Sequence, residues 1–216
     1  MTVRKALVLG LFLVSSSAYE DLLPSGLVFC RRNARCIMRM ISIHTCGSRS
    51  LPILKEGQLD IISHSAEQTQ RLGARLGALL LPGDIICLSG DMGAGKTVFS
   101  GGIGKGWGSK NPLTSPTFNL VHDHTRDSDS QHLYHLDCYR LERPDDIDSV
   151  GLDEILSGRG PVILEWPENI VKILPKQRLW IEIRVLEPTR RNFALMGEGK
   201  RYEELITKFR EFVFGA

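Results

Sequence analysis

The sequence has only five cysteines and almost no excess charge, and both features limit what the protein can be. Its five cysteines are an odd number without the paired spacing of a metal site, which favours a reducing compartment. The net charge is only +2, and the body of the chain has no strongly basic helix or charge block. These features argue against a nucleic-acid-binding surface built on bulk electrostatics. No internal repeat occurs, so repeat architectures are excluded as well.

The rest of the composition is that of a globular protein. The chain has 216 residues, of which 42% are hydrophobic and 24% are charged. This is enough for one folded domain with a sizeable core. We expect that domain to cover residues 55–216.

The first 54 residues have a different composition and are predicted to be a targeting extension. Arg4 and Lys5 precede an apolar run at 6–14 and small residues at 15–18, the layout of a secretory signal. The apolar run is too short for a spanning helix. Residues 30–50 are rich in Arg and Ser and contain no acid, as in organellar transit peptides.

A signal followed by a transit-like segment predicts a bipartite plastid presequence that is removed in the plastid stroma. One alternative is a single plastid or mitochondrial transit peptide that begins at Met38 or Met40, and a mitochondrial peptide would lead to the mitochondrial matrix. Another alternative is a buried hydrophobic helix.

From residue 55 onward, short apolar runs alternate with longer amphipathic ones, which predicts an α/β fold with a largely parallel sheet. Helices are predicted at 66–81, with Ser65 as cap, at 96–106 and at 202–214. The glycines of the second helix cost about 1 kcal/mol each in a helix interior, and we expect them to permit close packing on the sheet. Strands are predicted at 59–63, 84–89, 117–124, 132–137 and 162–165, with an antiparallel pair at 179–186 and 192–196.

The segment GDMGAGKT matches the phosphate-loop pattern G-x-x-x-x-G-K-[ST] and lies between a predicted buried strand and a helix. Its glycines let backbone N–H groups converge on phosphate oxygens, Lys96 would reach the β and γ phosphates, and Thr97 would ligate magnesium. The sequence therefore predicts a site for ATP and Mg²⁺. The predicted binding residues are Gly90, Asp91, Met92, Gly93, Ala94, Gly95, Lys96 and Thr97.

Two other predicted strands end in carboxylates. The apolar run 133–136 leads into Asp137, the form of a Walker B strand, although an Asp that caps the next segment is the alternative. Glu165 ends the predicted strand 162–165, where the alternative is a surface Glu beside a core Trp. Carboxylates at the carboxyl ends of central strands face the ligand crevice. We therefore predict that both organise magnesium or water.

Residues 115–118, Ser-Pro-Thr-Phe, lie about twenty residues after the loop, where P-loop proteins often place a switch that senses the γ-phosphate. Thr117 would then contact magnesium or the attacking water, and a plain turn is the alternative. Other polar or reactive side chains are predicted to have no part in the chemistry. Cys87 is predicted to be core, Arg190 and Arg191 solvated, and His122, His124, His132 and His135 too dispersed over strand faces to bind zinc.

Taken together, GDMGAGKT, SPTFNLV, YHLDCYRL and LEWPE resemble the TsaE family in order and spacing, over roughly residues 62–212. Members of that family are the ATPase subunit of the machinery that makes threonylcarbamoyladenosine in tRNA. The resemblance implies a P-loop NTPase-type three-layer sandwich whose central sheet is mostly parallel, with an antiparallel C-terminal strand pair. It also implies a slow, Mg²⁺-dependent ATP hydrolase that serves tRNAs reading ANN codons.

By the same resemblance, Thr117, Asp137 and Glu165 are the catalytic residues, and Thr97, Asp137 and Glu165 lie on the magnesium side. Trp166 is similar to a family tryptophan beside the nucleotide. The implied partners are TsaD-like and TsaB-like subunits, with tRNA engaged only through the complex and no stable membrane association. Bacterial members are cytoplasmic and lack the targeting extension.

Two other functions stay open from the residues alone. A small-molecule kinase would need an Arg-bearing lid, and no Arg-rich insertion follows Asp137. A non-catalytic module in which ATP only orders the switch is disfavoured by the two carboxylates. A GTPase is disfavoured because no Asn-Lys-x-Asp motif occurs. No arginine finger is evident near any motif, so we expect a partner to complete the charge stabilisation.

Overall fold

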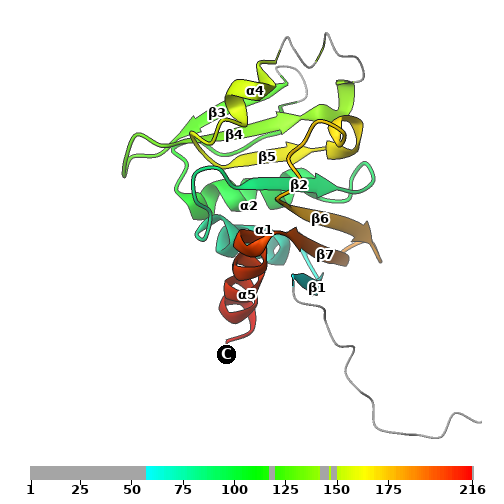
Figure 1. The fold of residues 1–216 in the computed structure, drawn as a ribbon. Helices are drawn as coiled ribbons and strands as arrows, with labels where there is room; N and C mark the ends of the chain where they lie inside the picture. The colour runs from blue at the N-terminus through cyan, green and yellow to red at the C-terminus, as the bar shows by residue number, and fades with distance from the viewer. Residues whose placement is uncertain (1–56, 117–119, 142–145, 147–149, 216) are drawn as a thin grey trace, which may run out of the picture. The chain divides into compact units, whose positions relative to one another are not determined.

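The fold of the chain was analysed in a computed structural model that describes residues 57–116, 120–141, 146 and 150–215. Residues 1–54, predicted to be the targeting extension, lie outside the described residues. Seven strands form one sheet with helices on both faces (Figure 1). The elements are β1 (Gln58–Ser63), α1 (Ala66–Gly77), β2 (Ile85–Ser89), α2 (Lys96–Trp107), β3 (Val121–Thr125), β4 (His132–Asp137), η1 (Cys138–Arg140), α4 (Leu152–Ile155), β5 (Val162–Glu165), η2 (Pro167–Ile170), β6 (Arg178–Val185), β7 (Arg191–Glu198) and α5 (Lys200–Phe214).

The strand order β1-β7-β6-β2-β5-β4-β3 places four mutually parallel strands, β6, β2, β5 and β4, at the centre. The strands β6 and β7 pair antiparallel. The predicted α/β class with a parallel centre and an antiparallel C-terminal pair is therefore confirmed. β1 and β3 add antiparallel neighbours at the two edges, against β7 and β4 respectively. The carboxyl ends of the central strands meet at one edge of the sheet, where ligands of open α/β folds bind.

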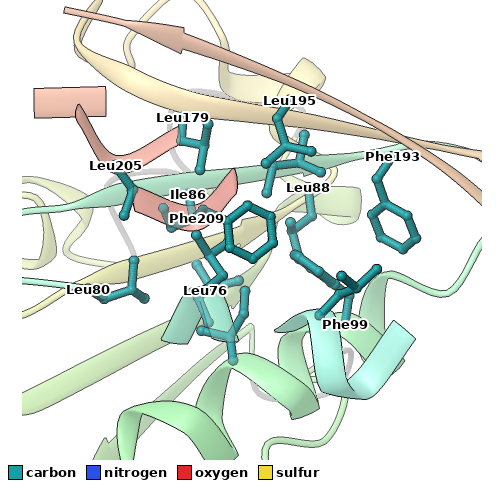
Figure 2. Packing of buried hydrophobic residues seen from close by; sticks show 14 of the residues in the cluster. Leu76, Leu80, Ile86, Leu88, Phe99, Leu179, Phe193, Leu195, Leu205 and Phe209 are labelled. Atoms are coloured by element: carbon teal, nitrogen blue, oxygen red, sulfur yellow. The ribbon is translucent and has the colours of Figure 1, made fainter. Parts of the chain in front are cut away.

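Each face of the sheet packs against its own set of helices, which gives three layers. The helices α1, α2 and α5 cover one face, where Leu76, Phe99 and Phe209 meet sheet residues such as Ile86 (Figures 1 and 2). On the other face, α4, η1 and η2 cover Cys87 and neighbouring apolar residues. Cys87 is fully buried, as predicted. Alternate residues of β2 contribute to the two cores because successive strand side chains point to opposite faces.

Two glycines of α2, Gly102 and Gly106, pack against helix α1, whereas close packing on the sheet was expected. A Cβ added to Gly102 would lie 2.3 Å from the carbonyl oxygen of Gln70, and one added to Gly106 would lie 1.8 Å from that of Ala74. From the α1 side, a Cβ on Gly73 would lie 2.3 Å from the carbonyl oxygen of Phe99. The two helices thus approach backbone to backbone, and only glycine fits between them.

Helix α1 ends at Gly77, although the predicted helix continued to residue 81. Ser65 caps its start by accepting a hydrogen bond from Gln68 N, as predicted. After Gly77 the chain tightens into turns, with Leu79 N and Leu80 N donating to carbonyls three residues back. Pro82 disfavours the helical conformation in residue 81, so it limits how far the helix could extend but does not explain its end at Gly77.

Strand β3 begins at Val121, and residues 117–119 of the strand predicted at 117–124 lie outside the described residues. Within the parts of the chain that the structure describes, no helix combines the length and the apolar character needed to cross a bilayer.

Candidate nucleotide-binding site

Most of the predicted site residues line one cavity of about 500 Å³ at the carboxyl edge of the central strands. The phosphate loop contributes Met92, Gly93, Gly95, Lys96 and Thr97 to its wall. The strand ends contribute Asp137, Glu165 and Trp166. Gly90, Asp91 and Ala94 belong to the same loop but do not line this cavity, and Thr117 lies outside the described residues.

The loop turns tightly from β2 into α2, and glycine permits this at two positions. Gly90 has φ of 134°, and a Cβ there would lie 2.3 Å from the carbonyl oxygen of Ile183. Gly95 has φ of 106° and precedes the first residue of α2. The left-handed glycine aims the first N–H groups of the helix at the cavity, where the helix dipole favours an anion.

Lys96 lies folded over the loop from which it starts. Its Nζ donates hydrogen bonds to the carbonyl oxygens of Gly90 at 2.6 Å and Asp91 at 3.0 Å. The same Nζ stands 3.7 Å from the ring centroid of Trp166. Burial lowers the pKa of Lys96 from its usual value, and the nearby carboxylates of Glu165 and Glu168 oppose that change. A cation held mainly by carbonyls and a ring face is well placed to exchange them for phosphate oxygens.

Asp137 and Glu165 are neighbours at the ends of the parallel strands β4 and β5, where the register pairs them directly. Both are almost fully buried, with exposures of 5% and 3%. Asp137 also accepts a hydrogen bond from Tyr139 N at 3.0 Å, as the N-cap of η1. Asp137 is therefore the cap that was the predicted alternative, and it also lines the cavity.

Glu165 accepts hydrogen bonds on both of its oxygens. Oε1 accepts from Ser100 Oγ and from His135 Nε2, each at 2.9 Å, and Oε2 accepts from Thr97 Oγ1 at 3.3 Å. Burial alone would raise the pKa of Glu165, but the hydrogen bond and charge of His135 and the hydrogen bond of Ser100 outweigh it, so the pKa lies below its usual value. A buried, ionised carboxylate beside a threonine hydroxyl is an oxygen-rich environment of the kind that Mg²⁺ prefers.

Trp166 holds its ring over Lys96 because of an unusual backbone. Its φ of 58° is left-handed, and its N donates to the carbonyl oxygen of Leu88 at 3.2 Å. The ring also packs against Tyr139, with centroids 5.1 Å apart. Pro167 follows as the first residue of η2, as its position predicted. Non-glycine residues held at positive φ concentrate at functional sites.

Arg140 lines the cavity, although no arginine finger was evident near any motif from the sequence. It is the last residue of η1, three positions after Asp137, and its side chain is exposed. Ser115 lines the same cavity. The sequence contained Arg140 within YHLDCYRL, but nothing in the motif indicated that the turn of η1 directs the residue toward the loop.

Arg191 was predicted to be a solvated turn residue, and the structure corrects this too. It is half-buried, and its Nε donates to the carbonyl oxygen of Ala94 in the phosphate loop at 3.0 Å. Its Nη1 donates to the carbonyl oxygens of Glu187 and Pro188 in the β6–β7 turn. Arg191 thereby ties that turn to the loop. It also lines a second cavity of about 360 Å³ on the other side of the loop, with Ser65, Glu67, Thr69, Val98 and Thr189 among the other lining residues.

Comparisons with known proteins agree with this geometry. A family model described as "Threonylcarbamoyl adenosine biosynthesis protein TsaE" matches residues 63–193, which include the loop, Asp137 and Glu165. The chain is 37% identical over 139 residues to the tRNA threonylcarbamoyladenosine biosynthesis protein TsaE of Bacillus subtilis (strain 168), covering 64% of this chain and 85% of the relative. It is 38% identical over 138 residues to the TsaE protein of Streptomyces coelicolor, covering 62% and 93%. A crystal structure of Bacillus subtilis YdiB is similar with a TM-score of 0.61 at 32% identity, covering 71% of this chain and 95% of that one.

Proposed function

The chain belongs to the TsaE family, and from this premise we propose that it binds ATP with Mg²⁺, hydrolyses it slowly and serves the synthesis of threonylcarbamoyladenosine in tRNA. The observation that carries the proposal is the convergence of Lys96, Thr97, Asp137 and Glu165 on one cavity at the carboxyl edge of the sheet. The relatives of the chain are named for that tRNA modification.

The phosphates would lie over the loop, held by its N–H groups and by Lys96 after it leaves the Gly90 and Asp91 carbonyls. Thr97, Glu165 and Asp137 supply the hydroxyl and carboxylate oxygens that suit Mg²⁺. When bound, the metal would neutralise charge on the β and γ phosphates. The second cavity adjoins the loop glycines and offers room for the ribose and base, beside Thr69 and Arg191.

In this arrangement Asp137 and Glu165 orient the metal and the attacking water, whereas the adenosine lies elsewhere. Asp137→Asn and Glu165→Gln should therefore reduce the rate of ATP hydrolysis on the order of 10²-fold with a much smaller effect on ADP affinity measured without Mg²⁺. Phosphate release and calorimetric ADP binding measure the two quantities. Asp123→Asn is the matched control, because this exposed carboxylate of β3 pairs with His132 away from the cavity. Normal hydrolysis in both site variants would refute the carboxylate roles.

We also propose that TsaD-like and TsaB-like partners stimulate the ATPase and bind the ATP form more tightly than the ADP form, with tRNA engaged only through them. A partner can shift the equilibrium between the ATP form and the ADP form only by the difference in its affinity for the two, typically about 1 to 3 kcal/mol. Titrating partners against the ATPase rate, and measuring complex affinity in ADP and in an ATP analogue, tests this. Equal affinities and an unstimulated rate would contradict the coupling.

Residues 1–54 are proposed to direct the protein to a plastid or a mitochondrion, on their composition alone. A fluorescent fusion of this segment should enter one of these organelles, and a diffuse cytosolic signal would reject the proposal. The chain without residues 1–54 should fold and bind ATP. Precipitation of that truncated chain, where the full chain is soluble, would show that the segment belongs to the fold.

A further inference from the structure

The two oxygens of Glu165 face different surroundings. Oε1 points into the protein, where it accepts from His135 Nε2 and Ser100 Oγ. Oε2 accepts from the hydroxyl of Thr97, which lines the cavity. His135 and Ser100 are both fully buried. The carboxylate is therefore held from behind while its other oxygen faces the proposed magnesium site.

We propose that His135 is a positioning residue that fixes Glu165 through Oε1 and so presents Oε2, beside Thr97, to the metal that accompanies the nucleotide. The inference rests on the proposed function, because it assigns a purpose to the orientation of Glu165 within that site. His135 itself is not among the residues that line the cavity. It acts through Glu165, as the outer partners of metal-ligating carboxylates do.

Of the two donors to Oε1, His135 is the one with no competing acceptor. Ser100 has a single hydroxyl proton, and its Oγ also lies 3.1 Å from the Lys96 carbonyl oxygen and 3.3 Å from that of Thr97. The His135 Nε2 contacts Glu165 only, among the residues that the structure describes. A carboxylate can only accept, so this bond requires the imidazole proton on Nε2.

The position of His135 in the core supports a specific role. It lies on the same face of β4 as Leu133, and both side chains are fully buried. Its Nδ1 is buried and has no partner within the described parts of the chain. A buried polar atom without a partner costs about 1 to 3 kcal/mol. The histidine at this position is therefore explained by the bond to Glu165.

The two bonds to Oε1 connect three elements that the sequence separates. His135 comes from β4, Glu165 from the neighbouring β5, and Ser100 from the second turn of α2. Strand β5 lies beside β4. A shift of Glu165 would therefore alter its bond to His135 on β4 and its bond to Ser100 on α2. His135 thus limits the carboxylate to one orientation.

Two amide replacements of His135 distinguish a role in positioning Glu165 from a role in packing the core. In His135→Gln, an amide N–H can reach about where Nε2 stood, whereas the shorter side chain of His135→Asn leaves Oε1 without that donor. His132→Gln is the matched control, since His132 is an exposed histidine of the same strand that pairs with Asp123. Thermal unfolding of all variants establishes that they are folded.

The readout is the tightening of ADP binding by Mg²⁺, measured as the ratio of calorimetric dissociation constants in EDTA and in Mg²⁺. We expect His135→Asn to reduce this ratio about 10- to 100-fold and to leave the dissociation constant in EDTA unchanged within about twofold. We expect His135→Gln to recover most of the loss in the ratio. A wild-type ratio in His135→Asn, or an equal loss in His135→Gln, would overturn the inference.

Glu165→Gln distinguishes a failure of this inference from a failure of the proposed function. Loss of the Mg²⁺ effect in Glu165→Gln, with none in His135→Asn, would overturn the positioning role alone. A full Mg²⁺ effect in Glu165→Gln would overturn the proposed role of Glu165 and, with it, the inference. Loss in Glu165→Gln and His135→Asn, with recovery in His135→Gln, is the result that supports both.

Discussion

Replacing Gly102 with alanine should destabilise the protein, although alanine is the better helix former. The added Cβ would lie 2.3 Å from the carbonyl oxygen of Gln70 and 3.0 Å from its carbonyl carbon. Both are backbone atoms of α1, so no side chain can rotate away and the helices must separate. Overpacking of this kind costs about 1 to 3 kcal/mol, and the rigid contact favours the upper end. The propensity gain of about 1 kcal/mol then leaves a net loss of about 2 kcal/mol.

Gly101→Ala is the matched control, because the substitution is identical and the position adjacent. A Cβ on Gly101 meets only the carbonyl oxygen of Leu113, at 3.4 Å, so the propensity gain of about 1 kcal/mol should appear as stabilisation. The two variants should differ by about 3 kcal/mol in the free energy of unfolding, or by roughly 6 to 12 °C in Tm. Urea unfolding followed by circular dichroism measures this difference. Equal stability of the two variants would refute the account of the α1–α2 contact.

Four further predictions concern the site and the core. Arg140→Ala should slow hydrolysis by the isolated protein on the order of 10²-fold with little change in ADP affinity; unchanged phosphate release would remove Arg140 from the mechanism. Arg191→Ala should weaken ADP binding about tenfold in calorimetry, because the loop loses a charged hydrogen bond at Ala94; wild-type affinity would contradict this. The pKa of Glu165 is lowered, and its ionised form is the one proposed to bind Mg²⁺, so the Mg²⁺ effect on ADP affinity should be lost at low pH. In His135→Asn that loss should begin at higher pH, because His135 helps to lower the pKa of Glu165. Superimposable pH profiles of the two proteins would count against this. Burial raises the pKa of Cys87 to about 12 and that of Cys138 as well, so peptide mapping should find neither labelled by maleimide in the folded protein.

The loop and the two carboxylates could be predicted from the sequence because their signals are local. A Gly-rich segment between an apolar strand and a helix limits where phosphate can bind. Asp137 and Glu165 each end a short apolar run, and parallel strands bring such ends to one edge of a sheet. That the two are direct neighbours depends on β4 lying beside β5, which the local patterns did not specify.

The residues that prediction missed are those whose role depends on contacts between distant parts of the chain. Arg191 touches Ala94, 97 positions earlier, because the β6–β7 turn lies next to the phosphate loop. His135 bonds to Glu165 on the neighbouring strand, and an isolated histidine in a strand gave no indication of this. The glycines of α2 were expected to permit close packing, but the partner of Gly102 and Gly106 is α1, and only the three-dimensional structure shows which neighbour comes close.

The presence of Arg140 in the cavity changes why a partner would be needed. If the isolated chain already carries a cation near the phosphates, a partner need not supply one, and coupling must operate through conformation. A route exists in the backbone, where Asp137 N donates to the carbonyl oxygen of Leu120 at 3.0 Å, two residues after the predicted switch at 115–118. Leu120 has φ of 60°, a conformation that costs a residue with a side chain about 1 to 2 kcal/mol. That strain is comparable with the coupling energies of about 1 to 3 kcal/mol by which binding partners shift such equilibria. Within the proposed function, a partner that relieves or reinforces this strain at Leu120 would shift Asp137 and thereby change the proposed rate of hydrolysis, without contributing a residue to the site.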